Sequence, residues 1–129
     1  MTNKSASTRG QQRAQKAFSL VNAAANNEWK DDYGRQCMHL PMLIQQSGLA
    51  QAIAFLESKA SDEKKSAYFG CLLDDFTALV GKSANRTEFA QLVRSAPVSE
   101  YQWLVREALA CATWMKRYAE AVLKASYEE

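Results

Sequence analysis

The sequence contains few residues that break helices. It has two prolines and five glycines among 129 residues, whereas 47% of its residues are apolar. Chains rich in proline and glycine and poor in apolar residues stay disordered, because they cannot bury enough apolar surface. This composition therefore excludes wholesale disorder, and the length suits one compact domain with a single core.

Histidines and paired cysteines, which build many catalytic and metal sites, are also scarce. His39 is the one histidine, and Cys37, Cys71 and Cys111 form no C-x-x-C pair. Zinc sites and redox dithiols need closely spaced ligands. We therefore predict no bound metal and no cofactor, and we expect the cysteines to be buried, reduced thiols.

Long apolar runs are missing as well. No stretch approaches the roughly 18 consecutive apolar residues that a membrane span requires, and the first residues lack the apolar segment of a secretory signal. We expect a cytoplasmic protein without a membrane partner.

Acidic residues are absent from the start of the chain, where Glu28 is the first carboxylate. The basic residues before it are Lys4, Arg9, Arg13 and Lys16. An acid-free arm of this kind suits contact with phosphates, which makes Arg9, Arg13 and Lys16 candidate RNA-binding residues. A solvated, frayed terminus explains the same pattern, so both interpretations stay open.

Apolar residues recur with the helical period of about 3.6 along almost the whole chain. This pattern predicts an all-α fold, a single compact bundle of about five to six helices with a long C-terminal helix. We assign residues 1–10 to a flexible basic tail and residues 11–129 to one helical-bundle domain. In the first helix, Ala17, Phe18 and Val21 are expected to face the core.

Glycine, proline and asparagine predict several helix boundaries. Pro41 lacks a backbone donor and should kink or restart the second helix near Leu40. Gly48 should end that helix in the left-handed conformation, and Gly81 should end the fourth helix. Asn85, with a glutamate three residues later, should cap the fifth helix.

Two further helix starts are predicted from serine. Ser61, followed by two acidic residues, should cap the fourth helix. Ser99 and Gln102 should form a capping box at the start of the last helix, and Val98 with Trp103 has the spacing of a hydrophobic staple.

Two adjacent carboxylate pairs, Asp31–Asp32 and Asp74–Asp75, are the best candidates for catalysis. Carboxylates can hold Mg²⁺ for phosphodiester cleavage, which would make the protein a helical metal-dependent ribonuclease. Neighbouring helical residues diverge by about 100°, so solvated helix faces explain the pairs better. Because no nucleophile with its base and no Gly-rich phosphate loop is recognisable, we predict that the protein is not an enzyme.

Three basic residues of the last helix share one outward line. Arg106, Arg117 and Lys124 fall within roughly 20° of one another, nearly opposite the apolar stripe. Trp103 and Trp114 share a second line on the flank of the helix. The row of basic side chains suits contact with RNA, and the two tryptophans suit either a protein interface or the stacking of bases. Charged side chains that face water and tryptophans that pack against a neighbouring helix explain the two rows equally well.

Two segments carry a family resemblance. The run from Leu40 to Leu56, LPMLIQQSGLAQAIAFL, resembles the signature of the small helical subunit of the Cmr complex, the type III-B CRISPR RNA-silencing effector. The stretch from Arg106 to Leu123, REALACATWMKRYAEAVL, resembles that family's C-terminal helix. With the helix order and length, the resemblance covers about residues 11 to 125.

The resemblance implies a non-catalytic scaffold in antiviral defence. In that family, several small subunits stack in a row beside the subunits that hold the guide RNA, and they bound the channel where target RNA pairs. The implied partners are other Cmr subunits, further copies of the chain, and the backbones of guide RNA and target RNA. The small helical subunit of another CRISPR effector type is the alternative.

Overall fold

A computed structural model describes residues 7–127, which form six helices and no strand. The helices are α1 (Arg9–Ala24), α2 (Lys30–Ser47), α3 (Leu49–Ala60), α4 (Ser66–Val80), α5 (Arg86–Ser95) and α6 (Val98–Leu123). The predicted all-α bundle with a long C-terminal helix is confirmed, since α6 has 26 residues. No helix within this part of the chain is long and apolar enough to cross a bilayer.

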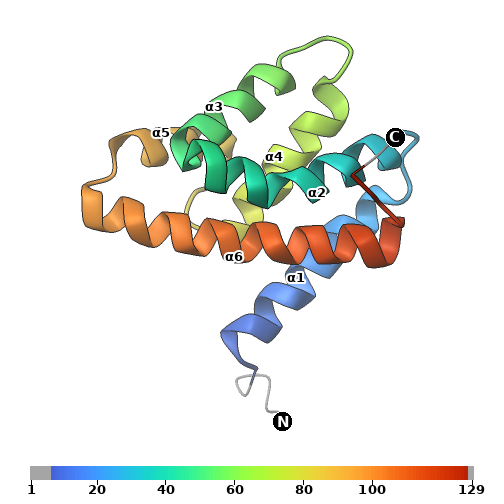
Figure 1. Cartoon of the computed structure of the whole chain (residues 1–129), viewed down its shortest axis with the longest axis horizontal. Helices are drawn as coiled ribbons and strands as arrows, with labels where there is room; N and C mark the ends of the chain where they lie inside the picture. Colours follow the sequence, from blue (N-terminus) through green and yellow to red (C-terminus); the bar gives the residue numbers. More distant parts are fainter. Residues whose placement is uncertain (1–6, 128–129) are drawn as a thin grey trace.

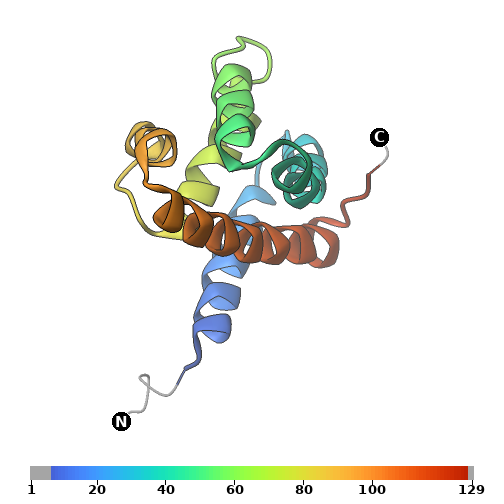
Figure 2. The ribbon, with the colours of Figure 1, turned by 60° about the vertical axis from the view of Figure 1, so that its left-hand side comes forward.

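Helix α6 runs across the molecule, and α1 and α2 both pack against it. The N-terminal half of α1 projects beyond the other helices (Figures 1 and 2). Helices α3, α4 and α5 lie on the other side of α6 from this projecting half. The bundle therefore presents two different surfaces on opposite sides of α6.

Side chains from all six helices meet in one hydrophobic core. Helix α4 contributes the apolar face predicted for it, namely Phe69, Leu72, Leu73, Phe76, Leu79 and Val80. In α1, Ala17 and Val21 are buried as predicted, but Phe18 is 44% exposed. The prediction for Phe18 is wrong because its ring lies beside Tyr118 at the edge of the contact between α1 and α6.

The helix boundaries predicted at Gly48, Gly81 and Asn85 are confirmed, but the backbone conformation of Gly48 differs from the predicted one. Gly81 has the left-handed φ of 74° and ψ of 20°, and the Asn85 side chain accepts a hydrogen bond from the Glu88 amide. Gly48 has φ 84° but ψ 157°. This extended region with positive φ is almost restricted to glycine, and it lets α3 begin at the next residue.

Helix α2 continues through Pro41, so the predicted restart near Leu40 is wrong. Leu40 and Ile44 lie on either side of the proline and are both buried. Because core packing supplies most helix stability in a folded protein, these contacts hold the segment helical although Pro41 provides no amide donor.

Both predicted serine starts are wrong. Ser61 follows the end of α3, where its hydroxyl donates to the Glu57 carbonyl. The Asp62 carboxylate accepts from the Lys64 amide at 2.8 Å, and this local turn delays the start of α4 to Ser66. Such side-chain bonds compete with helix formation.

The last helix begins at Val98, before the expected capping box. Pro97 precedes it with φ −60°, a value already suited to a helix start. Ser99 therefore falls inside the first turn, and Val98 is 73% exposed, so it forms no staple with Trp103.

The first helix also begins earlier than predicted. Thr8 and Gln11 form a reciprocal capping box, so α1 starts at Arg9, inside the range assigned to the basic tail. Residues 1–6 of that tail, including Lys4, lie outside the described residues.

Candidate nucleic-acid interface

The basic residues of α1 are held against the bundle. Arg13 forms an ion pair with Glu107 of α6, and Arg9 lies 3.5 Å from the same carboxylate. Lys16 donates from Nζ to the Ala78 carbonyl at 2.6 Å, near the end of α4, where the helix dipole favours a cation. Arg13 thus helps to hold α1 on α6, whereas Arg9 keeps 70% of its side chain exposed.

Glu107 is the residue that sequence reasoning missed at this site. It lies on the same flank of α6 as Trp103 and Trp114, at the place where α1 crosses. Its position between Trp103 and Trp114 on one flank of the helix was the sequence feature that could have indicated a role for this carboxylate. Nothing in the sequence indicated which segment would supply its basic partners.

The outward face of α6 carries two arginines that have no acidic partner within the described part of the chain. Arg106 and Arg117 are exposed, and neither forms an ion pair with any residue between 7 and 127. At about 1.5 Å per residue they lie roughly 16 Å apart along the helix. The intervening residues on this face, Ala110 and Thr113, are small, so an extended strand can approach the helix closely.

Lys124 departs from the predicted line. It is exposed, but it follows the end of α6 with the left-handed φ of 58° and ψ of 34°. Because the helical repeat stops before it, Lys124 does not continue the row formed by Arg106 and Arg117.

Both tryptophans are partly buried. The Lys82 ammonium lies 4.7 Å from the centre of the Trp103 ring. The Trp114 ring stacks on Tyr118 with centroids 5.8 Å apart, and Tyr118 meets the Phe18 ring edge-to-face at 5.5 Å. The tryptophans therefore make contacts within the chain and still leave part of their surface exposed.

The second carboxylate pair is divided between surface and interior. Asp74 binds Arg86 through two hydrogen bonds of 2.8 and 2.9 Å. Asp75 turns inward, where it accepts from the Tyr33 hydroxyl at 2.6 Å and from the Cys71 thiol at 3.5 Å. The two carboxylates therefore do not converge on one ligand.

The first carboxylate pair does not converge on one ligand either, although both residues lie at the surface. Asp32 binds Arg35 at 3.1 Å, and Asp31 is exposed. Among the residues that the structure describes, no group of three or more histidine, cysteine or acidic side chains is arranged to hold a metal ion.

Burial raises the pKa of Asp75 above its ordinary value, although the hydrogen bonds from Tyr33 and Cys71 act in the opposite direction. Burial and the nearby Asp75 carboxylate raise the pKa of the Cys71 thiol to about 12. The thiol is therefore protonated at neutral pH and can donate to Asp75.

The raised pKa of Asp75 predicts a pH dependence of stability. A carboxyl group with a raised folded-state pKa stabilises the fold fully below its unfolded pKa of about 4, and this contribution is lost as pH rises through the folded-state pKa. The Asp75→Asn variant keeps an acceptor for Tyr33 and cannot titrate. We expect the stability advantage of the wild type over this variant to shrink between pH 4 and pH 7.

Urea unfolding of both proteins at several pH values measures this difference. An advantage that instead grew towards pH 7 would mean that the ionised carboxylate stabilises the core.

Comparisons with known proteins identify the family. A family model described as CRISPR-associated protein (Cas_Cmr5) matches residues 9–122. The CRISPR system Cmr subunit Cmr5 of Thermus thermophilus is 38% identical over 117 residues, which cover 91% of this chain and 97% of that protein. The crystal structure of a CRISPR-associated Cmr5 family protein from the same organism matches with a TM-score of 0.82 at 37% identity, covering 91% of this chain and 98% of that one. The matched residues run from the first residue of α1 almost to the end of α6, and the chain therefore belongs to the Cmr5 family of CRISPR-associated proteins.

Proposed function

We propose that this chain is the small subunit of a type III-B Cmr ribonucleoprotein complex, where several copies stack along the channel that holds guide and target RNA. The observation that carries the RNA contact is the outward face of α6, on which Arg106 and Arg117 are exposed without an acidic partner among the described residues. Membership of the Cmr5 family supports the choice of complex over other CRISPR effector types.

This face suits an RNA backbone of any sequence. Arginine binds phosphate through a planar, bidentate group, and the small Ala110 and Thr113 leave room for a strand between the two arginines. Two arginines in one copy bind weakly, but many copies along one strand raise the overall affinity without any new contact. Arg9 and Lys16 would add positive charge beside the path, while Arg13 holds α1 in place.

The proposed role is non-catalytic, with RNA cleavage assigned to other subunits and the complex working in the cytoplasm. Three of the four candidate aspartates are engaged with Arg35, Arg86 or Tyr33, which supports this assignment. Further copies of the chain and other Cmr subunits are the proposed protein partners.

Gentle purification of the tagged chain from its native cell tests the proposal. We expect mass spectrometry to find other Cmr subunits and RNA sequencing to find short guide RNAs that carry repeat sequence. Cells without the CRISPR array serve as the control, in which the guide RNAs should disappear. Recovery of the chain alone, or with unrelated proteins and no guide RNA, would contradict the proposal.

A further inference from the structure

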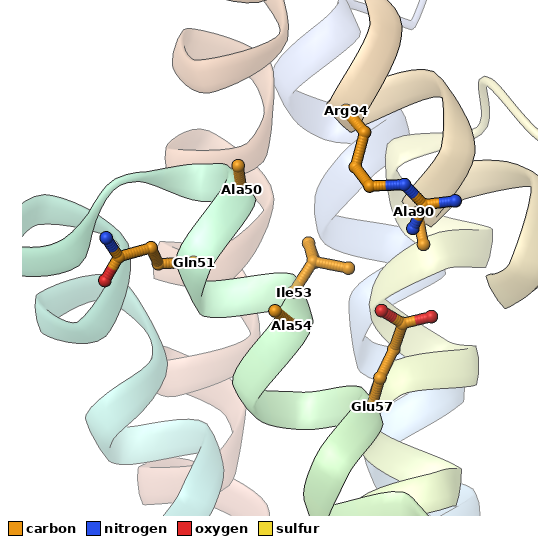
Figure 3. Close-up of a pocket in the computed structure, with 7 residues that line it drawn as sticks. All are labelled: Ala50, Gln51, Ile53, Ala54, Glu57, Ala90 and Arg94. Atoms are coloured by element: carbon orange, nitrogen blue, oxygen red, sulfur yellow. The ribbon is translucent and has the colours of Figure 1, made fainter.

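A shallow hollow lies between α3 and α5 (Figure 3). Its volume is about 250 Å³, and it is lined by Ala50, Gln51, Ile53, Ala54, Glu57, Ala90 and Arg94. Figure 3 shows Ile53 between the two helices, with Glu57 reaching in from α3 and Arg94 from α5. Because three lining residues are alanines, the hollow is open enough to accept a large side chain.

The two charged groups at this hollow are available to a partner. Among residues 7–127, neither Glu57 nor Arg94 forms an ion pair. A guanidinium beside an apolar floor suits an aromatic ring, because the negative face of the ring attracts a cation. A carboxylate beside the same floor suits amide donors or positive charge. The chemistry of the hollow therefore fits an aromatic side chain on a helix without acidic residues.

Helix α1 presents such a side chain. Phe18 is 44% exposed. Its ring contacts Tyr118 of α6, and Tyr118 stacks on Trp114 of the same helix. Gln15 and Asn22, which are exposed about one turn before and after Phe18, can donate to a carboxylate. No acidic residue occurs before Glu28, so α1 has no charge that would repel Glu57.

The other exposed large aromatic side chains fit less well. Among the described residues these are Phe55 and Tyr127. Phe55 belongs to α3 itself, next to Ala54 of the hollow. The Tyr127 ring lies against His39 at 5.4 Å and below the Lys116 ammonium at 5.2 Å, within its own chain.

We propose that Phe18 of one copy docks into the hollow between α3 and α5 of the next copy. The Phe18 ring lies where α1 meets α6, whereas the hollow lies between α3 and α5, so the two parts of the contact are different surfaces of the chain. Such a contact is heterologous, and copies joined by it head to tail continue as an open row unless their rotation closes a ring. The inference rests on the proposed function, since that function requires copies arranged in a row.

Disulfide trapping with the purified full-length chain tests this contact. A chain that carries both Asn22→Cys and Gln51→Cys should form a ladder of dimers, trimers and longer species under mild oxidation. Each single variant should remain monomeric, and a mixture of the two should stop at dimers. Both positions are exposed, so the substitutions preserve the core, and the wild type controls for oxidation of the native cysteines.

Variants on the two sides of the contact make the test specific. Phe18→Glu and Ala54→Arg, each added to the double-cysteine chain, should slow ladder formation at least about tenfold, as expected for a residue central to an interface. Met42→Glu changes another exposed apolar residue, on α2, and should leave the rate unchanged. Circular dichroism confirms that each variant is folded.

The outcomes separate this contact from the proposed function. Absence of the ladder, its persistence in Phe18→Glu, or equally fast dimerisation of Asn22→Cys alone would overturn the contact. If the native chain nevertheless purifies with Cmr subunits and guide RNA, the proposed function still holds. A Phe18-dependent ladder from a chain that does not purify with them supports the contact and contradicts the proposed function.

Discussion

Replacing Arg106 and Arg117 together with glutamate is expected to weaken RNA binding by the assembled complex at least about tenfold near 0.1 M salt. Each substitution removes a proposed phosphate contact and adds a repelling charge at the same position. Both side chains are exposed and unpaired among the described residues. Because such surface changes alter stability by less than about 0.5 kcal/mol, the melting temperature should stay the same.

Filter binding at several salt concentrations measures this effect. The loss of two contacts to single-stranded RNA should make the plot of log affinity against log salt less steep by about 1.4 for each engaged copy. The matched control is Lys64→Glu with Lys65→Glu, two exposed residues in the turn between α3 and α4, which lies away from α6 (Figure 1). Equal weakening in the control would show a general effect of charge and contradict a specific contact at α6.

Replacing Phe76 with alanine is expected to lower the free energy of unfolding by about 3–5 kcal/mol. The ring is completely buried in α4 and meets the Phe89 ring of α5 edge-to-face at 6.0 Å. Removing it leaves a cavity that the surrounding helices cannot fill. Because small domains are stable by only about 5–15 kcal/mol, the variant should lose a large part of its stability.

Urea unfolding followed by circular dichroism measures this loss. The matched control is Phe55→Ala, since Phe55 is 40% exposed at the surface of α3. It should cost less than about 1.5 kcal/mol. Similar losses in the two variants would contradict the position of Phe76 at the centre of the core.

The candidate interface was predictable only in part. Helical periodicity placed Arg106 and Arg117 outside because both belong to one long helix, and the structure finds both exposed. Arg13 was a candidate for another reason, the basic start of the chain that lacks acidic residues. Its partner Glu107 is 94 residues away, and no local pattern could reveal that pairing.

The division of Asp74 and Asp75 shows the same limit. Their 100° divergence on a helix predicted that they would separate. Periodicity did not show that Asp75 would meet the Tyr33 hydroxyl, because this bond requires α2 and α4 to pack together. The raised pKa of Asp75 follows from that packing and was not visible in the sequence.

Some features of this protein were determined locally, along the chain. The helical period, the turns at Gly48 and Gly81 and the cap at Asn85 depend on residues within a few positions of one another. Their energies are therefore already set by the sequence, and these helix boundaries were confirmed, although ψ of Gly48 is 157° and not the left-handed value that was predicted.

Other features were decided only when the helices packed. Helix α2 passes through Pro41 because its flanking residues are buried. The start of α3 gains a partner from α6, since the Tyr101 hydroxyl accepts from the Ala50 amide at 3.0 Å. Phe18 is exposed because of the place where α1 crosses α6. These outcomes depend on contacts between residues far apart in sequence, and such contacts exist only in the folded bundle.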